Sequence, residues 1–242
     1  MIPLRDSTPS GSVPYVTISI IVLNSVVWLY EVSLGPAVSD FILQYGLIPV
    51  RFLHPYRFHT GAVEGALTPL FSSIFMHGGW MHIIGNMWFL WIFGDNIEDR
   101  LGHARFAFFY LLCGVGAALI QVIFHPASKI PMVGASGAIS GVLGAYLVSY
   151  PPARIYTLFI FFFIVRFVEI PAFVYLLLWF LFQLISGAAE LGAGREIGGV
   201  AYWAHMGGFI VGIFLLWIMP TNPARRTPTW EDRRSLKVFT RW

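Results

Sequence analysis

The sequence is poor in cysteine and in charge. Cys113 is the only cysteine among 242 residues, which excludes an intramolecular disulfide and a thiolate metal cluster. Charged residues make up 11% of the chain, whereas soluble proteins carry about 25%. Hydrophobic residues make up 57% of it. This composition excludes an ordinary soluble domain and indicates an integral membrane protein.

Several apolar runs approach the length of about 20 residues that a helix needs to cross a bilayer. They predict an all-α membrane protein, a bundle of six transmembrane helices. The expected spans are residues 14–34, 76–93, 104–124, 134–150, 170–187 and 200–219. Residues 1–13 and the basic tail 220–242 flank this transmembrane domain, 14–219, and are expected in the cytoplasm. The first run lacks a basic leader and an A-x-A-like cleavage site, so we expect it to be retained.

Some stretches fit no span. Residues 35–69 mix apolar residues with prolines, arginines and histidines, which predicts a long interfacial loop with a short amphipathic piece near Asp40–Gly46. Residues 155–168 form an apolar run that Arg166 interrupts, and its length favours an interfacial or re-entrant segment. The charged stretch 94–102 is expected to mark an exit into water, and the polar stretch 188–199 to form a loop.

Basic residues support the count of six spans. With both termini inside, the inner segments hold eleven Lys and Arg residues and the outer loops hold four, as the positive-inside rule requires. A seventh span at 155–168 would place the basic tail outside. We therefore expect both termini in the cytoplasm, in a prokaryotic cell membrane. The net charge of +3 comes largely from this tail, which suits anionic lipid rather than nucleic acid.

Polar side chains inside apolar spans are costly, so each one needs a reason. His82 and Asn86 are four residues apart on the second span and share a face. Ser136 opens the fourth span and His205 lies in the last. Since these three spans run in the same direction and carry the residues near their outer ends, the four side chains are expected at one depth.

Two stripes of small residues predict that the fourth and sixth spans pack closely. The stripes are Gly137, Gly141 and Ala145 on one span, and His205, Gly208 and Gly212 on the other. Such faces let helix backbones approach in a membrane. Their contact brings His205 near Ser136, and a serine with a base in hydrogen-bond reach is an activated nucleophile. The backbone at Ser136, together with His82 and Asn86, can then stabilise an oxyanion.

Three segments carry a resemblance to a known family. They are MHGGWMHIIGN at 76–86, GASG at 134–137 and AHMGGFIVG at 204–212. With the six-span layout, they make the chain resemble the rhomboid intramembrane serine proteases over nearly its whole length. The resemblance implies a protease that cleaves transmembrane protein substrates near the outer membrane face, with no metal or other cofactor.

The resemblance also implies individual roles. Ser136 corresponds to the nucleophile and His205 to the general base, while His82 and Asn86 correspond to the residues on the oxyanion side. Gly134 matches the position whose backbone flanks the nucleophile. His77 matches a histidine with a structural role before the second span.

Two departures from the family pattern affect the site. Some members carry an aromatic residue four positions after the nucleophile that braces the imidazole, and here this position is Ser140. Some members also carry a Trp-Arg pair in the first loop, which this sequence lacks. The orientation of the imidazole and the attachment of the loop are therefore left open by the sequence.

Three alternatives account for parts of the sequence. His77, His82 and His205 are enough histidines for a zinc site, but no HExxH pattern or carboxylate supports one. An inactive rhomboid-like protein that binds membrane helices would usually have lost the serine or the histidine, and both are present. A small-solute transporter predicts inverted repeats, which this sequence does not show.

Overall fold

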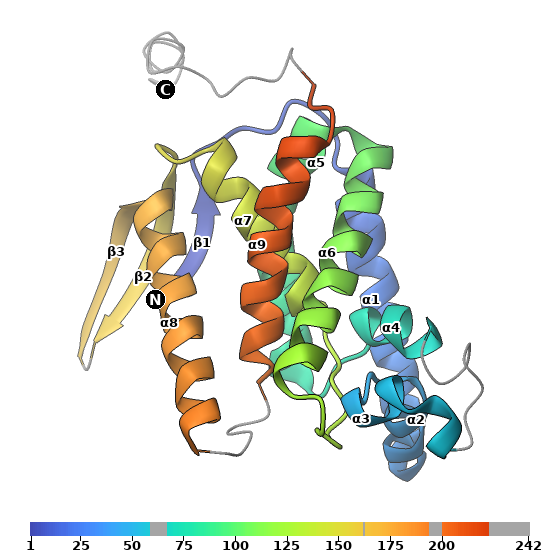
Figure 1. Cartoon of the computed structure of the whole chain (residues 1–242). Helices are drawn as coiled ribbons and strands as arrows, with labels where there is room; N and C mark the ends of the chain where they lie inside the picture. Colours follow the sequence, from blue (N-terminus) through green and yellow to red (C-terminus); the bar gives the residue numbers. More distant parts are fainter. Residues whose placement is uncertain (59–66, 162, 194–199, 223–242) are drawn as a thin grey trace, which may run out of the picture.

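The computed structural model describes residues 1–58, 67–161, 163–193 and 200–222. Long helices in these ranges form one bundle (Figure 1). They are α1 (Tyr15–Ser33), α5 (Trp80–Leu101), α6 (His103–Phe124), α7 (Ser136–Ser149), α8 (Ala172–Ala193) and α9 (Tyr202–Ile218). Among the described residues, α1, α6 and α8 are long and apolar enough to cross a membrane, and α7 and α9 are shorter apolar helices. The predicted helical membrane bundle is confirmed, and the number of crossings stays a prediction.

The C-terminal end of α5 lies further along the chain than the sequence predicts. The charged stretch 94–102 was predicted to leave the helix, but α5 continues to Leu101. The reason is that the buried Glu98 carboxylate accepts hydrogen bonds from the backbone N–H groups of Val16 and Thr17, at 2.9 and 2.7 Å. These groups belong to the first turn of α1, where N–H groups lack intrahelical partners and favour a negative charge.

α8 also extends further than predicted. It runs to Ala193, so residues 188–193 are helical rather than part of a loop. Within the described residues, α8 is buried along one stripe only. That stripe contains Ala172, Tyr175, Leu176, Gln183, Gly187 and Glu190. This spacing follows the helical period, so one face of α8 contacts the bundle.

A small sheet accompanies the bundle, which the apolar pattern does not predict. Its antiparallel strands are β1 (Ile2–Asp6), β2 (Arg154–Phe161) and β3 (Ile164–Pro171), in that order. Residues 154–161 and 164–171 thus pair as antiparallel strands and not as a seventh helical span, and their interfacial position stays a prediction. The hairpin is rich in aromatic and β-branched residues, which suit strands. β1 is held to the bundle by Trp88, whose indole N–H donates to the Pro3 carbonyl at 2.6 Å.

The long first loop is largely helical and lies at the lower end of the bundle in Figure 1. Its described pieces are η1 (Gly35–Ala37), α2 (Val38–Tyr45), α3 (Pro49–Leu53), η2 (Pro55–Phe58), α4 (Thr68–Ser72) and η4 (Ser73–Phe75). The short amphipathic piece expected near Asp40–Gly46 coincides with helix α2. Leu47 and Met132 exchange two backbone hydrogen bonds of 3.0 and 2.8 Å. This bridge attaches the loop to the segment that leads into α7, without a Trp-Arg pair.

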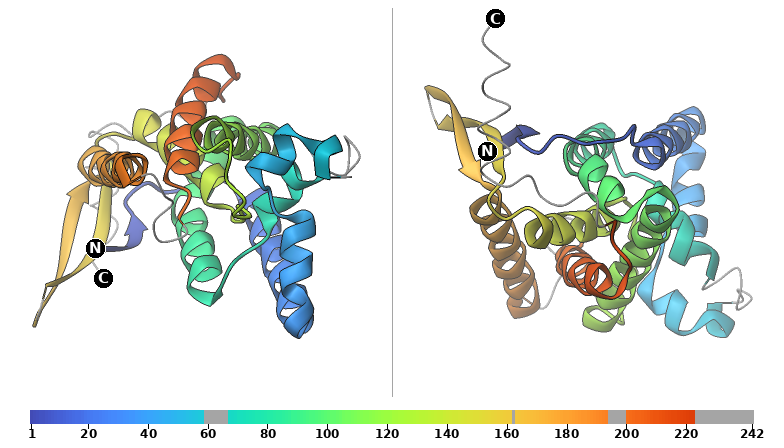
Figure 2. Two further views of the ribbon diagram at one scale, coloured as in Figure 1. Left: turned by 60° about the horizontal axis from the view of Figure 1, so that its bottom comes forward. Right: turned by 90° about the horizontal axis from the view of Figure 1, so that it is seen from above.

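α7 and α9 meet along their small residues. A methyl group added to Gly208 would overlap the Gly137 carbonyl, and one added to Gly212 would overlap the Gly141 carbonyl. α6 closes a third side, where Cys113 leaves no room for a side chain at Gly141. Figure 2 shows the three helices side by side in both views. The backbones are therefore in direct contact, as the two stripes of small residues predict.

A larger side chain in this contact should destabilise the bundle and reduce activity. Overpacking a well-packed core costs about 1–3 kcal/mol, and we expect Gly141→Leu and Gly208→Leu each to cost at least this much, because a Cβ would overlap Cys113 at Gly141 and the Gly137 carbonyl at Gly208. The measurement is thermal unfolding in detergent, with activity recorded in parallel. Gly192→Leu is the matched control, since a Cβ on Gly192 of α8 meets nothing within 4 Å. Unchanged unfolding midpoints for both test variants would contradict the contact.

Candidate active site

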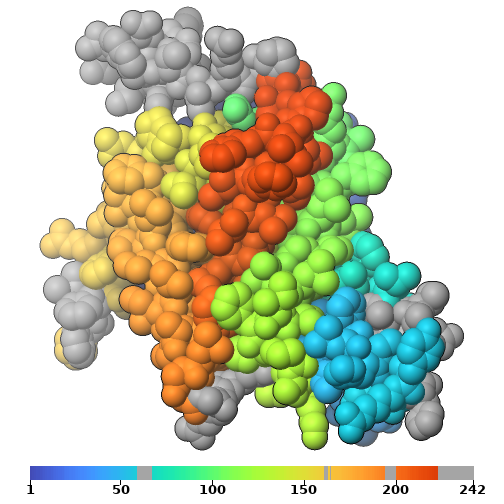
Figure 3. Space-filling model, viewed as in Figure 1, coloured from blue at the N-terminus to red at the C-terminus, as the bar shows by residue number. Residues whose placement is uncertain are grey.

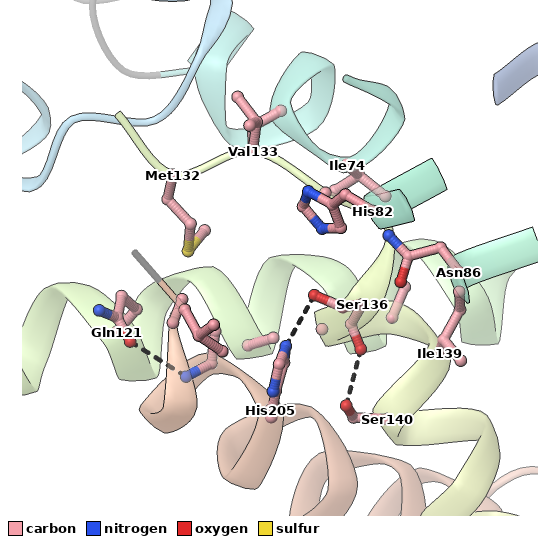
Figure 4. Close-up of a pocket in the computed structure, with 18 of the residues that line it drawn as sticks. Ile74, His82, Asn86, Gln121, Met132, Val133, Ser136, Ile139, Ser140 and His205 are labelled. Carbon is pink, nitrogen blue, oxygen red and sulfur yellow. Dashed lines mark hydrogen bonds between the residues drawn. The ribbon is translucent and has the colours of Figure 1, made fainter. Parts of the chain in front are cut away.

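The N-terminal ends of α5, α7 and α9 lie at one end of the bundle and enclose a cavity of about 750 Å³. Its lining includes His82, Asn86, Ser136 and His205. The three helices thus bring the four polar side chains singled out in the sequence to one place. Figure 4 shows Ser136 between His205 on one side and the pair of His82 and Asn86 on the other.

Ser136 is the first residue of α7 and lies against His205 of α9. Its Oγ is 2.8 Å from His205 Nε2 (Figure 4). The small-residue contact described above makes this approach possible, because Gly208 lies one turn beyond His205 and touches the Gly137 carbonyl. Ser136 and His205 are both partly exposed to the cavity. The pair therefore has the geometry in which an imidazole takes a proton from a serine hydroxyl.

The other imidazole nitrogen contacts a residue that the sequence analysis did not select. His205 Nδ1 is 2.8 Å from Gln183 Oε1 on α8. An amide oxygen only accepts hydrogen bonds, so Nδ1 carries the proton and Nε2 is left with its lone pair facing the Ser136 hydroxyl. The signal that would have found Gln183 was available, since it is a polar residue within an apolar span.

Ser140 does not take over the role of an aromatic brace. Its hydroxyl donates to the Ser136 backbone carbonyl at 2.6 Å, one turn back along α7. The ring near the imidazole comes instead from Trp179 of α8, with centroids 6.0 Å apart and planes tilted by 34°. The orientation that the sequence left open is thus supported by α8 and not by α7.

His82 lies on the opposite side of the serine. Gly134 has φ +132°, and a Cβ there would lie 2.6 Å from His82 Nε2 and 3.6 Å from Ser136 Oγ, so only glycine fits. The Gly78 N–H donates to His82 Nδ1 at 3.4 Å, which leaves the proton of the neutral ring on Nε2. His82 Nε2–H therefore lies close to the Gly134–Ser136 segment, on the far side of the serine from His205.

Asn86 is held by His77, which comes before α5 and is itself held by Glu31. Its amide nitrogen donates to Nε2 of the fully buried His77 at 3.0 Å. The His77 backbone N–H in turn donates to the Glu31 carboxylate of α1 at 3.1 Å. An amide nitrogen carries two hydrogens, so one is left after the bond to His77, and Asn86 lines the same cavity as Ser136. The sequence analysis selected His77 but missed Glu31, although it is an acidic residue within the first apolar run.

Gln121 is a further residue that sequence reasoning missed. Its Oε1 accepts a hydrogen bond of 3.1 Å from the backbone N–H of Ala204, next to His205 (Figure 4). The N–H groups of a first helical turn lack intrahelical partners, so this bond satisfies one of them at the start of α9. Gln121 thereby fixes the turn that carries the imidazole.

A zinc site finds no support in the part of the chain that the structure describes. There, no group of three His, Cys, Asp or Glu side chains is arranged to hold a metal ion. His77 and His82 pack edge to face with centroids 5.1 Å apart. His205 is engaged with Ser136 and Gln183 on the other side of the cavity.

The structure is a helical membrane bundle in which a serine and a histidine meet at one end. The sequence matches the Rhomboid domain over residues 64–222, well over half of the chain. The chain therefore belongs to the rhomboid family and is an integral membrane protein. The resemblance noted in the sequence is confirmed.

Curated relatives support this membership. The chain is 27% identical to Rhomboid-like protein 11, chloroplastic, of Arabidopsis thaliana, across 83% of this chain and 67% of that protein. It is also 27% identical to Rhomboid protein 1, mitochondrial, of Saccharomyces cerevisiae, across 79% of this chain and 52% of that protein. Presenilin-associated rhomboid-like protein A, mitochondrial, of Danio rerio is 34% identical to it, across 43% of this chain and 28% of that protein. The chain thus spans about half the length of the yeast relative.

These names also bear on location. The three relatives are named for chloroplasts or mitochondria, so they give no support to the predicted prokaryotic cell membrane.

Proposed function

We propose that the protein is an intramembrane serine endopeptidase that cleaves transmembrane protein substrates through a dyad of Ser136 and His205. The observation that carries the proposal is the 2.8 Å hydrogen bond between Ser136 Oγ and His205 Nε2. It lies in a cavity that also presents His82 and Asn86. A nucleophile, a base and donors on the opposite side are the components that acyl transfer requires.

The first half of the reaction follows from this arrangement. His205 Nε2 takes the hydroxyl proton as Ser136 Oγ bonds to the scissile carbonyl carbon. The carbonyl oxygen becomes negative on the side of His82 and Asn86, where N–H donors and the positive end of the α7 dipole stabilise it. The intermediate then expels the amine, which receives its proton from the His205 imidazolium. A Ser136 ester of the N-terminal substrate fragment remains.

Water completes the reaction by the same steps. His205 accepts a proton from a water molecule, which attacks the ester carbonyl and regenerates the Ser136 hydroxyl. The substrate fragment leaves as a carboxylic acid. No metal or nucleotide enters this sequence of steps.

The proposed location of the reaction follows from the position of the site. The N-terminal ends of α5, α7 and α9 lie at the end of the bundle opposite Ile218, the C-terminal residue of α9 (Figure 1). We place that site end at the extracytoplasmic face and both termini in the cytoplasm, since eleven of the fifteen Lys and Arg residues then fall inside. Transmembrane protein substrates would reach the cavity from the surrounding lipid.

This orientation can be measured with fusions. A green fluorescent protein joined to the C-terminus is expected to fluoresce in bacterial cells, because the fused domain stays in the cytoplasm. Alkaline phosphatase inserted after Ala127, between α6 and α7, should be active, because we place this connection outside. The opposite pair of results would overturn the proposed orientation.

The direct test of function is cleavage of a labelled single-span protein by the purified enzyme in liposomes. Products that form with the wild type and not with Ser136→Ala support the protease. Binding of the substrate without any cleavage by the wild type would favour the alternative, an inactive rhomboid-like protein that binds membrane helices.

A further inference from the structure

We propose that Gln183 is a positioning residue for the general base. It would hold the His205 imidazole in the tautomer and orientation in which Nε2 can deprotonate Ser136. This inference rests on the proposed protease function and adds a third member to the dyad. It is drawn from a contact between α8 and α9 that neither apolar pattern nor motif predicts.

The chemistry of the contact fixes the tautomer. His205 Nδ1 and Gln183 Oε1 are 2.8 Å apart, and His205 Nε2 and Ser136 Oγ are also 2.8 Å apart. A neutral imidazole has one N–H and one lone pair, and Gln183 Oε1 offers only an acceptor on the Nδ1 side. The Ser136 hydroxyl must therefore donate to Nε2. Serine and cysteine proteases use the same logic with a carboxylate or an amide behind the histidine.

The burial of Gln183 supports the importance of its contact with His205. Its side chain is 6% exposed, in the stripe of α8 that faces the bundle. A buried amide without partners is costly, and a polar residue in an apolar membrane helix generally faces a partner in the bundle. The bond to His205 supplies that partner.

α8 is held close enough to α9 for this bond to form. Gly187 lies one turn beyond Gln183, and a Cβ there would lie 3.3 Å from the Trp203 ring of α9. The ring of Trp179, one turn before Gln183, lies beside the imidazole. Figure 3 shows α8 lying against α9 on the face of the molecule that it displays. Two consecutive turns of α8 thus contact His205, whereas Ser140 of α7 bonds to backbone.

The role of Gln183 can be separated from packing with two substitutions. Gln183→Leu keeps similar bulk but removes the acceptor, so the imidazole can rotate and take the wrong tautomer. Misplacement of a catalytic group by about 1 Å can cost about 10²-fold. We expect kcat to fall by about 10- to 100-fold with little change in KM, while the thermal midpoint in detergent is kept.

Gln183→Glu supplies the complementary readout. It keeps an acceptor for Nδ1–H, so it should retain far more activity than Gln183→Leu. Its carboxylate favours the imidazolium form of His205, so the acidic limb of the pH profile of kcat/KM should move to higher pH. His82 of α5 is the titratable neighbour that also acts on His205, and it is the same in all variants.

The outcomes distinguish this inference from the protease proposal itself. Wild type and Ser136→Ala are assayed together, and a wild type without activity would refute the proposed function. Leu184→Ala, at the next and more exposed position of α8, is the matched control and should behave as wild type. If the wild type is active, the positioning role is refuted when Gln183→Leu retains its full kcat and Gln183→Glu leaves the pH profile unchanged. A Gln183→Leu variant that only raised KM would refute it as well.

Discussion

Replacement of Ser136 or His205 by alanine is expected to abolish cleavage while leaving the bundle folded. Ser136→Ala removes the atom that bonds to the carbonyl carbon, and His205→Ala removes the base 2.8 Å away from it. In a serine protease with a triad, loss of the nucleophile or the base costs about 10⁶ in kcat. The double variant should be no worse than either single one, because residues that act as one unit are not additive.

The measurement is product formation from a labelled single-span substrate, with thermal unfolding recorded for each variant. Two matched controls belong in the same series. Ser149→Ala changes a buried serine at the other end of α7, and His54→Ala changes an exposed histidine of the first loop. Both should cleave as the wild type does. Appreciable turnover by Ser136→Ala would end the serine-protease proposal.

Loss of the Asn86 amide should slow turnover without weakening substrate binding. The negative charge on the carbonyl oxygen develops only on the way to the tetrahedral intermediate, so a donor to it lowers kcat when removed and leaves KM nearly unchanged. Removal of one such donor elsewhere costs about 10²–10³ in kcat. We expect a loss of about 10- to 100-fold for Asn86→Ala, because His82 and the Ser136 backbone N–H remain.

The measurement must separate this role from a structural one, because Asn86 also bonds to His77 at 3.0 Å. Thermal unfolding therefore accompanies the kinetics, and Ile84→Ala on the exposed side of α5 is the control. A serine-directed phosphonate should still label Asn86→Ala, since the pair of Ser136 and His205 is intact. Wild-type turnover would remove Asn86 from the site, and a large rise in KM at unchanged kcat would make it a substrate-binding residue.

Much of the fold could be predicted because a bilayer constrains a sequence strongly. A helix must offer a long apolar run to lie in lipid, so the apolar runs predicted the positions of α1, α5, α6, α7, α8 and α9. For most of these helices, the predicted ends lie within a few residues of the observed ends. The same constraint drew attention to Ser136, His82, Asn86 and His205, since a polar group at that depth is costly. Small residues at every fourth position indicated where two of these helices touch.

The remaining features depend on partners that are distant in the sequence. The acidic end of α5 is helical because Glu98 meets the N-terminus of α1, some 80 residues earlier in the chain. Residues 154–161 form the central strand β2 because its backbone groups pair with β3 on one side and with β1 on the other. A local pattern measures only how apolar a segment is and with what period, so it shows neither the partner of Glu98 nor the pairing of β2 with β1.

The sequence by itself determined the membrane class, the approximate helices and the four polar residues that the cavity brings together. Only the tertiary structure decided what stands behind the histidine. Gln183 and Trp179 lie on α8, and nothing in the local pattern of α8 says which neighbouring helix its buried stripe will face. That choice is made by the packing of all the helices at once, because the contact at Gly187 sets how closely α8 approaches α9.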